Sequence, residues 1–211
     1  MKKTRVHFRA GELVLEGILA IPEVASPFPT VIVCHPHPLY GGSMDNNVVD
    51  SLSETLTQAS LASFKFNFRG VGGSQGEFGQ GIGEREDVEA AISFISTVKE
   101  VDSNRIGLAG YSAGAGFALP VGSNDARIKA LVAISPPLSM FDFDSLKSCH
   151  KPKLLISGNR DSYIPANQFI EFCQNLPEPK ECVSIEGADH FWWGYEPRLA
   201  AKVTAFFTKI L

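Results

Sequence analysis

The sequence predicts an α/β fold with a mostly parallel central sheet, an N-terminal antiparallel hairpin and helices on both faces. From residue 30 onward, short apolar runs of strand length alternate regularly with stretches of helical periodicity. Before that, two strand-like segments flank the turn 10–12, which is typical of a hairpin. The chain has 211 residues, of which 44% are hydrophobic, enough for one substantial core.

Each element follows from a local pattern. The run 30–34 is continuous and rich in β-branched residues, which suits a strand covered on both faces. The predicted strands are 5–8, 13–21, 30–34, 63–68, 105–109, 128–135, 153–157 and 181–185. The predicted helices are 47–60, 84–99, the stretch that follows Ser112, 166–175 and 196–211.

The whole chain, 1–211, is expected to form a single domain. It shows no internal repeat and no low-complexity linker. The segment 137–152 between two predicted strands is too short to hold a cap domain. We therefore expect an open cleft over the carboxyl ends of the strands.

Composition excludes several classes of partner. Lys and Arg number 19 against 23 Asp and Glu, and they are scattered along the chain, so nucleic acid is not expected. No apolar run approaches a membrane span and no signal core follows the N-terminus, which indicates a cytoplasmic protein without membrane contact. Four cysteines form no CxxC pair and are expected to be free thiols: Cys34, Cys149, Cys173 and Cys182.

Ser112 is the candidate nucleophile. It stands in the pentapeptide GYSAG, which follows the strand 105–109 and leads into a stretch of small residues. This context is typical of a strand-to-helix elbow that exposes a serine hydroxyl. Gly110 and Gly114 meet the need for small neighbours at such a turn. The competing interpretation is an ordinary turn serine.

Asp161 and His190 complete a candidate triad. Asp161 follows the strand 153–157 and His190 follows the strand 181–185, so both lie at carboxyl ends of strands. Their order after Ser112 is the order in which an elbow serine, its acid and its base occur in the chain. Ser112 would attack a carbonyl carbon, His190 would take its proton, and Asp161 would orient the imidazole.

Alternatives remain open for the acid and the base. Asp161 is also suited to an Asx turn or a helix N-cap, and His190 to a surface loop. Asp142 and Asp144 are rival acids on the loop after the preceding strand. Asp189 is disfavoured because side chains of adjacent loop residues tend to diverge.

Through these motifs, the chain resembles the α/β-hydrolase superfamily from about residue 13 to its C-terminus. The segments HPHPLYGGSM at 35–44 and NFRGVGGS at 67–74 are similar to those of small, lidless bacterial members related to dienelactone hydrolases and serine esterases. Dienelactone hydrolase itself uses a cysteine nucleophile, so its substrate does not transfer to this chain. The resemblance implies an α/β-hydrolase fold without a cap domain.

The resemblance also implies an oxyanion hole of two N–H groups. One belongs to Ala113, directly after the nucleophile, and the other to the loop 35–42. The two prolines of that loop lack an N–H, which leaves His37 and Leu39, with Leu39 slightly favoured.

Aromatic and apolar residues near these loops are candidates for a substrate pocket, although some of them are equally suited to packing beneath the loops. The predicted pocket residues are Tyr40, Tyr111, Leu138, Met140, Phe141 and Trp192.

These features predict a serine hydrolase, most readily a carboxylesterase that cleaves small or medium acyl esters through an acyl-enzyme at Ser112. No metal or organic cofactor is expected, because His35 and His37 lack a third ligand cluster nearby. The expected partner is a small-molecule ester, and the chain is expected to be a monomer or a homodimer. The alternatives are another acyl-transfer or peptide-bond hydrolase with the same triad, or a binding protein that retains the fold without catalysis.

Overall fold

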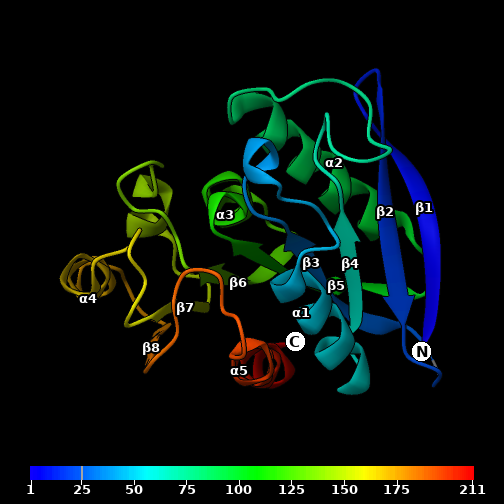
Figure 1. Cartoon of the computed structure of the whole chain (residues 1–211). Helices are drawn as coiled ribbons and strands as arrows, with labels where there is room; N and C mark the ends of the chain where they lie inside the picture. Colours follow the sequence, from blue (N-terminus) through cyan, green and yellow to red (C-terminus); the bar gives the residue numbers. More distant parts are fainter. Residues whose placement is uncertain (25) are drawn as a thin grey trace.

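The computed structural model describes residues 1–24 and 26–211 and contains an eight-stranded sheet with the order β1-β2-β4-β3-β5-β6-β7-β8 (Figure 1). Antiparallel pairing joins β1 to β2 and β2 to β4, and the pairs from β4 through β8 are parallel. The strands are β1 (Lys2–Ala10), β2 (Leu13–Ile21), β3 (Phe28–Cys34), β4 (Ala62–Phe66), β5 (Val101–Tyr111), β6 (Ile128–Ile134), β7 (Lys153–Gly158) and β8 (Lys180–Ile185).

Helices cover both faces of this sheet. Their bounds are α1 (Asn47–Gln58), α2 (Ile82–Thr97), α3 (Ala113–Asn124), α4 (Ala166–Gln174) and α5 (Glu196–Ile210), with short 3₁₀ turns η1 (Pro38–Tyr40) and η2 (Asp144–Ser148). In Figure 1, α1 and α5 lie below the sheet and α2 and α3 above it, while α4 lies at the end that carries β8. The predicted α/β class, the N-terminal hairpin and the helices on both faces are confirmed.

The core between the sheet and helices α1 and α5 follows from the sequence pattern. In α1, Val48, Leu52 and Leu56 recur at intervals of four and are all buried against the sheet. In α5, Leu199 and Val203 recur in the same way and join the same cluster. The central strands β3, β5 and β6 are apolar on both faces because helices cover both sides, as expected for parallel strands.

The expectation of four free thiols is wrong for one pair. Cys173 on α4 and Cys182 on β8 are joined by a disulfide, because the helix packs beside the edge strand with a Cα–Cα distance of 6.3 Å. Cys34 and Cys149 are free and buried. In the part of the chain that the structure describes, no helix is long and apolar enough to cross a membrane.

The parallel order has one consequence for function. The carboxyl ends of β3, β5, β7 and β8 lie at the same edge of the sheet. The segments that leave these ends carry Ser112, Asp161, His190 and the candidate oxyanion donors.

Candidate active site

Ser112 lies at the sharp turn between β5 and α3. Its backbone has φ 53° and ψ −125°, outside the ordinary regions for a residue with a side chain. A hydrogen bond to the neighbouring strand fixes the turn: the Ser112 amide donates to the Ile134 carbonyl on β6 at 2.8 Å. The helix α3 begins at the next residue, so the hydroxyl stands at the positive end of the helix dipole.

The two glycines of the elbow are required by space. A Cβ on Gly110 would lie 2.5 Å from the Cα of Ala115, and a Cβ on Gly114 would lie 2.4 Å from the carbonyl oxygen of His35. Both neighbours are backbone atoms, which cannot move aside. The sequence argument for small residues at these positions therefore has a direct steric basis.

Ser112, His190 and Asp161 form a continuous line of hydrogen bonds. Ser112 Oγ lies 3.0 Å from His190 Nε2, and His190 Nδ1 lies 2.8 Å from Asp161 Oδ2. A carboxylate only accepts, so Nδ1 carries the imidazole proton and Nε2 is left to accept from the serine. The structure thus brings together the three residues that the sequence proposed, in the geometry that proton transfer needs.

The environment of Asp161 separates it from its rivals. Its side chain is fully buried, and Oδ1 accepts the amides of Tyr163 at 2.9 Å and Ile164 at 3.2 Å. Asp142 and Asp144 are exposed on the preceding loop, where the Asp142 carboxylate accepts the Asp144 amide. Of these three carboxylates, Asp161 is the one in contact with the imidazole.

Neighbouring elements hold the loop that carries His190. The Tyr111 hydroxyl donates to the His190 carbonyl at 2.7 Å, and burial raises the pKa of Tyr111, which keeps the phenol protonated as a donor. Asn47 Nδ2 donates to the next carbonyl, that of Phe191, at 3.1 Å. Asp189 does not face the imidazole and instead accepts the Phe191 amide at 2.9 Å.

His35 fixes the loop that leaves β3. Its Nδ1 donates to the Pro36 carbonyl at 2.6 Å, and its Nε2 accepts the Phe68 amide at 3.1 Å. Burial lowers the pKa of His35 to about 4, so the ring is neutral, in agreement with one donating and one accepting nitrogen. Both nitrogens are therefore engaged within the fold.

The Leu39 amide, which the sequence slightly favours as the second oxyanion donor, donates a hydrogen bond within its own loop. The Leu39 amide donates to His37 Nδ1 at 3.2 Å, and the Leu39 side chain is 67% exposed. Within residues 1–24 and 26–211, the amides of His37 and Ala113 have no hydrogen-bond partner. The geometry therefore favours His37 over Leu39 as the second donor beside Ala113.

A cavity of about 320 Å³ opens above the hydroxyl of Ser112. Its lining is mostly apolar and aromatic and consists of Pro36, His37, Tyr40, Gly41, Gly42, Asn46, Tyr111, Ser112, Ala113, Pro137, Met140, Phe141, Tyr163, His190 and Phe191. Four of the predicted pocket residues are among them: Tyr40, Tyr111, Met140 and Phe141.

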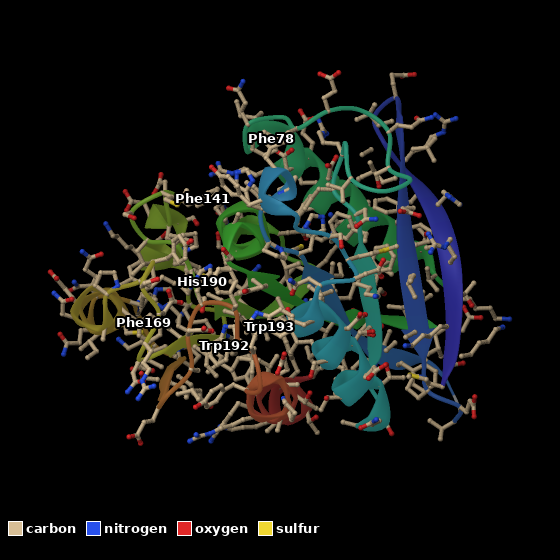
Figure 2. The ribbon with its side chains drawn as sticks, in the orientation of Figure 1. Phe78, Phe141, Phe169, His190, Trp192 and Trp193 are labelled. Atoms are coloured by element: carbon tan, nitrogen blue, oxygen red, sulfur yellow. A yellow bond between two sulfur atoms is a disulfide. The ribbon has the colours of Figure 1, made fainter. Side chains whose placement is uncertain are left out.

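Two predicted pocket residues do not line this cavity. Trp192 is fully buried among the residues that pack against α5, and its Nε1 donates to Ser135 Oγ at 3.1 Å. Leu138 packs against the core on the other face of the sheet. Figure 2 shows Trp192 on the α5 side of His190 and Phe141 on the α3 side.

Sequence reasoning missed Tyr163, which follows Asp161 by two residues and lines the cavity. Phe191, directly after His190, lines it as well. Proximity in sequence to the acid was the available signal for Tyr163.

A larger hollow of about 630 Å³ lies between α2 and α3. Its lining is polar, with Arg85 and Arg127 beside Glu89, Asp125 and Asp142. Its lining includes none of Ser112, His190 and Asp161, so the smaller cavity is the candidate active site. Among the described residues, no group of three or more His, Cys, Asp or Glu side chains is arranged to hold a metal ion.

Comparison with known proteins supports the fold. A family model described as PET hydrolase-like matches residues 86–209, and one described as X-Pro dipeptidyl-peptidase (S15 family) matches residues 14–146. An uncharacterised protein of Rickettsia prowazekii is 34% identical over 198 residues, which cover 89% of this chain and 82% of the relative.

Solved structures extend the likeness over nearly the whole chain. An alpha-beta serine hydrolase homologue from Coxiella burnetii superposes with a TM-score of 0.89 at 33% identity and covers 97% of each chain. An α/β serine hydrolase without a lid from Xanthomonas campestris gives a TM-score of 0.87 at 27% identity and covers 99% of this chain and 94% of its own. With the sheet order, the elbow and these matches in agreement, the chain belongs to the α/β-hydrolase superfamily.

Proposed function

We propose that the protein is a serine carboxylesterase that cleaves small or medium acyl esters. The observation that carries this proposal is the hydrogen-bonded line Ser112–His190–Asp161 at the floor of an apolar cavity of about 320 Å³. That volume lies at the lower end of the range for small-molecule sites. It suits an acyl group of modest length.

The reaction proceeds in two halves. Ser112 Oγ attacks the ester carbonyl carbon as its proton passes to His190 Nε2, and the amides of Ala113 and His37 receive the oxyanion. His190 then gives the proton to the departing alcohol, which leaves an acyl-enzyme. In the second half, His190 takes a proton from water as the water attacks the acyl carbon, and then returns it to Ser112 Oγ. The Asp161 carboxylate stabilises the imidazolium in both halves.

The residue ranges that the two family models match support esterase chemistry over peptidase chemistry. The PET hydrolase-like match spans Ser112, Asp161 and His190 together, whereas the X-Pro dipeptidyl-peptidase match ends at residue 146, before the acid and the base. Peptide-bond cleavage by the same three residues is the second candidate, because the S15 match includes the elbow.

Hydrolysis of a p-nitrophenyl ester series from acetate to decanoate tests the proposal. We expect turnover to peak at one short or medium acyl length and to disappear in Ser112→Ala, whose melting temperature stays close to that of the native chain. A p-nitroanilide series run in parallel distinguishes the peptidase. Full ester turnover by Ser112→Ala would exclude this serine as the nucleophile.

A fluorophosphonate probe separates an idle fold from an active one. Covalent labelling of Ser112 in the native chain, with none in His190→Ala, is expected of a serine activated by this imidazole. A folded native chain that takes up no probe would favour the non-catalytic binding protein.

A further inference from the structure

The ring of Tyr163 lies against the candidate base. Its centroid is 4.7 Å from that of the His190 imidazole, with 47° between the planes. Phe191 stands perpendicular to both rings, at 6.2 Å from Tyr163 and 5.8 Å from His190. The three rings therefore form one cluster at the mouth of the cavity.

The backbone places this ring firmly. The Tyr163 amide donates to Asp161 Oδ1 at 2.9 Å, and the next residue, Ile164, is fully buried in the core. The residue that holds one carboxylate oxygen of the acid therefore also sets its own ring against the base. Both members of the Asp161–His190 pair are in contact with Tyr163.

The ring also shields the imidazole. The His190 side chain is only 10% exposed, whereas Tyr163 is 54% exposed. The partly exposed tyrosine ring therefore lies, tilted, beside a histidine that is nearly buried. The aromatic ring is the part of Tyr163 that lies within contact distance of the imidazole.

Besides Tyr163, three charged or titratable side chains surround the His190 imidazole: those of Asp161, Ser112 and Tyr111. Asp161 and Ser112 bind its two nitrogens, and the Tyr111 ring lies 5.9 Å away while its hydroxyl is held by the His190 carbonyl. The tyrosine ring on the open side adds a negative π-face within the distance at which aromatic rings attract cations.

We propose that Tyr163 is a positioning residue, whose ring holds the His190 imidazole in place and stabilises the imidazolium that forms when Ser112 loses its proton. This role rests on the proposed function. It gives the base a fixed neighbour, supplied by the loop that carries the acid.

Two substitutions separate the aromatic face from simple bulk. Tyr163→Phe keeps the ring, and we expect its kcat and the acidic limb of its pH profile to match those of the native chain on p-nitrophenyl butyrate. Tyr163→Leu keeps an apolar cover without a π-face. We expect it to lower kcat about tenfold, or about 1.4 kcal/mol in the barrier, and to move the acidic limb to lower pH, since the protonated base has lost stabilisation. A leucine variant with native kcat and an unmoved limb would overturn the proposal.

Tyr40→Leu is the matched control. Tyr40 lines the same cavity, but its ring lies 4.7 Å from His37 instead of His190. Its removal is expected to change KM and to leave the acidic limb in place. An equal displacement of the limb in Tyr40→Leu would show that any loss of aromatic lining has this effect, and the assignment to Tyr163 would fall.

An NMR titration keeps the inference independent of turnover. The ¹⁵N signals of His190 are followed against pH in Ser112→Ala, with and without Tyr163→Leu. We expect the leucine variant to titrate at lower pH, and a midpoint that is unchanged or higher would overturn the role of the ring. A native chain that cleaves no ester but shows the expected shift would refute the proposed function alone.

Discussion

The backbone amide of Leu39 donates a hydrogen bond to the ring of His37, at 3.2 Å from Nδ1. Through this bond the His37 side chain caps the start of η1. The bond also occupies the Leu39 N–H, which the sequence slightly favours for the oxyanion hole. Among the three candidate oxyanion donors, the amides of His37 and Ala113 have no hydrogen-bond partner in the described part of the chain. We therefore expect the donor of the loop after β3 to be His37, two residues before Leu39.

Replacing single amides by esters tests this assignment. Leucic acid at position 39 removes only the Leu39 N–H, and we expect ester turnover to stay within a few-fold of native. Lactic acid at position 113 removes the Ala113 N–H, and we expect a loss of about 10²–10³ in kcat. A comparable collapse with leucic acid would return the oxyanion role to Leu39.

Asp161→Asn is expected to reduce kcat by about 10⁴, the scale seen when an orienting carboxylate becomes an amide and the imidazole takes the wrong tautomer. The matched controls are Asp142→Asn and Asp144→Asn, whose carboxylates are exposed, with Asp144 paired to Lys147 at 2.7 Å. Both controls should keep native turnover. If one of them lost activity while Asp161→Asn kept it, the acid would belong to the rival loop.

Gly114→Ala is expected to destabilise the fold by about 3 kcal/mol or more, because the new methyl would overlap the His35 backbone. Gly194→Ala is the control, since its φ is 78° but no atom lies within 4 Å of the added carbon. Its cost should be about 1 kcal/mol from backbone strain alone. Urea denaturation of both variants measures the difference, and equal stabilities would contradict the steric account of the elbow.

Acid should destabilise the protein through His35. The pKa of this histidine is about 4 in the fold and near 6.5 when unfolded, so between these values the unfolded chain binds a proton that the folded chain does not. Stability therefore falls as pH drops from about 6.5 to about 4, by roughly 3 kcal/mol from this group. In His35→Gln that part of the slope should vanish. Parallel stability curves for the two proteins across this range would rule out the assignment.

The disulfide between Cys173 and Cys182 closes a short loop, with nine residues of separation. Under oxidising conditions, Cys182→Ser should lower the free energy of unfolding by about 2–3 kcal/mol, and reductant should lower that of the native chain by a similar amount. Cys149→Ser serves as the control for a free thiol. Titration of four thiols in the unreduced, denatured native chain would show that the bond is not formed.

The sequence was sufficient where side-chain periodicity or sterics act locally. The strand 13–21 was predicted with the bounds of β2, and the glycines around Ser112 were predicted from the space that an elbow requires. Both depend on neighbours along the chain. The chain order of Asp161 and His190 also sufficed to place them at one edge, because parallel strands align their carboxyl ends.

Predictions were wrong where a side chain's direction depends on distant packing. Trp192 follows the base closely, yet its backbone φ of 63° accompanies an indole buried beside α5 instead of in the cavity. The bond between Cys173 and Cys182 depends on how α4 lies along β8, which their spacing does not encode. The hydrogen bond from the Leu39 amide to the His37 ring depends on how the loop turns, which the sequence does not reveal.

The loop of His190 is held through two consecutive carbonyls, one by Tyr111 from β5 and the other by Asn47 from the start of α1. These two anchors belong to different elements, and α1 lies on the same face of the sheet as α5. The main chain beneath the imidazole is therefore immobilised as soon as the core assembles. An arriving substrate finds its proton acceptor already aligned, and little of its binding free energy is diverted into ordering the protein.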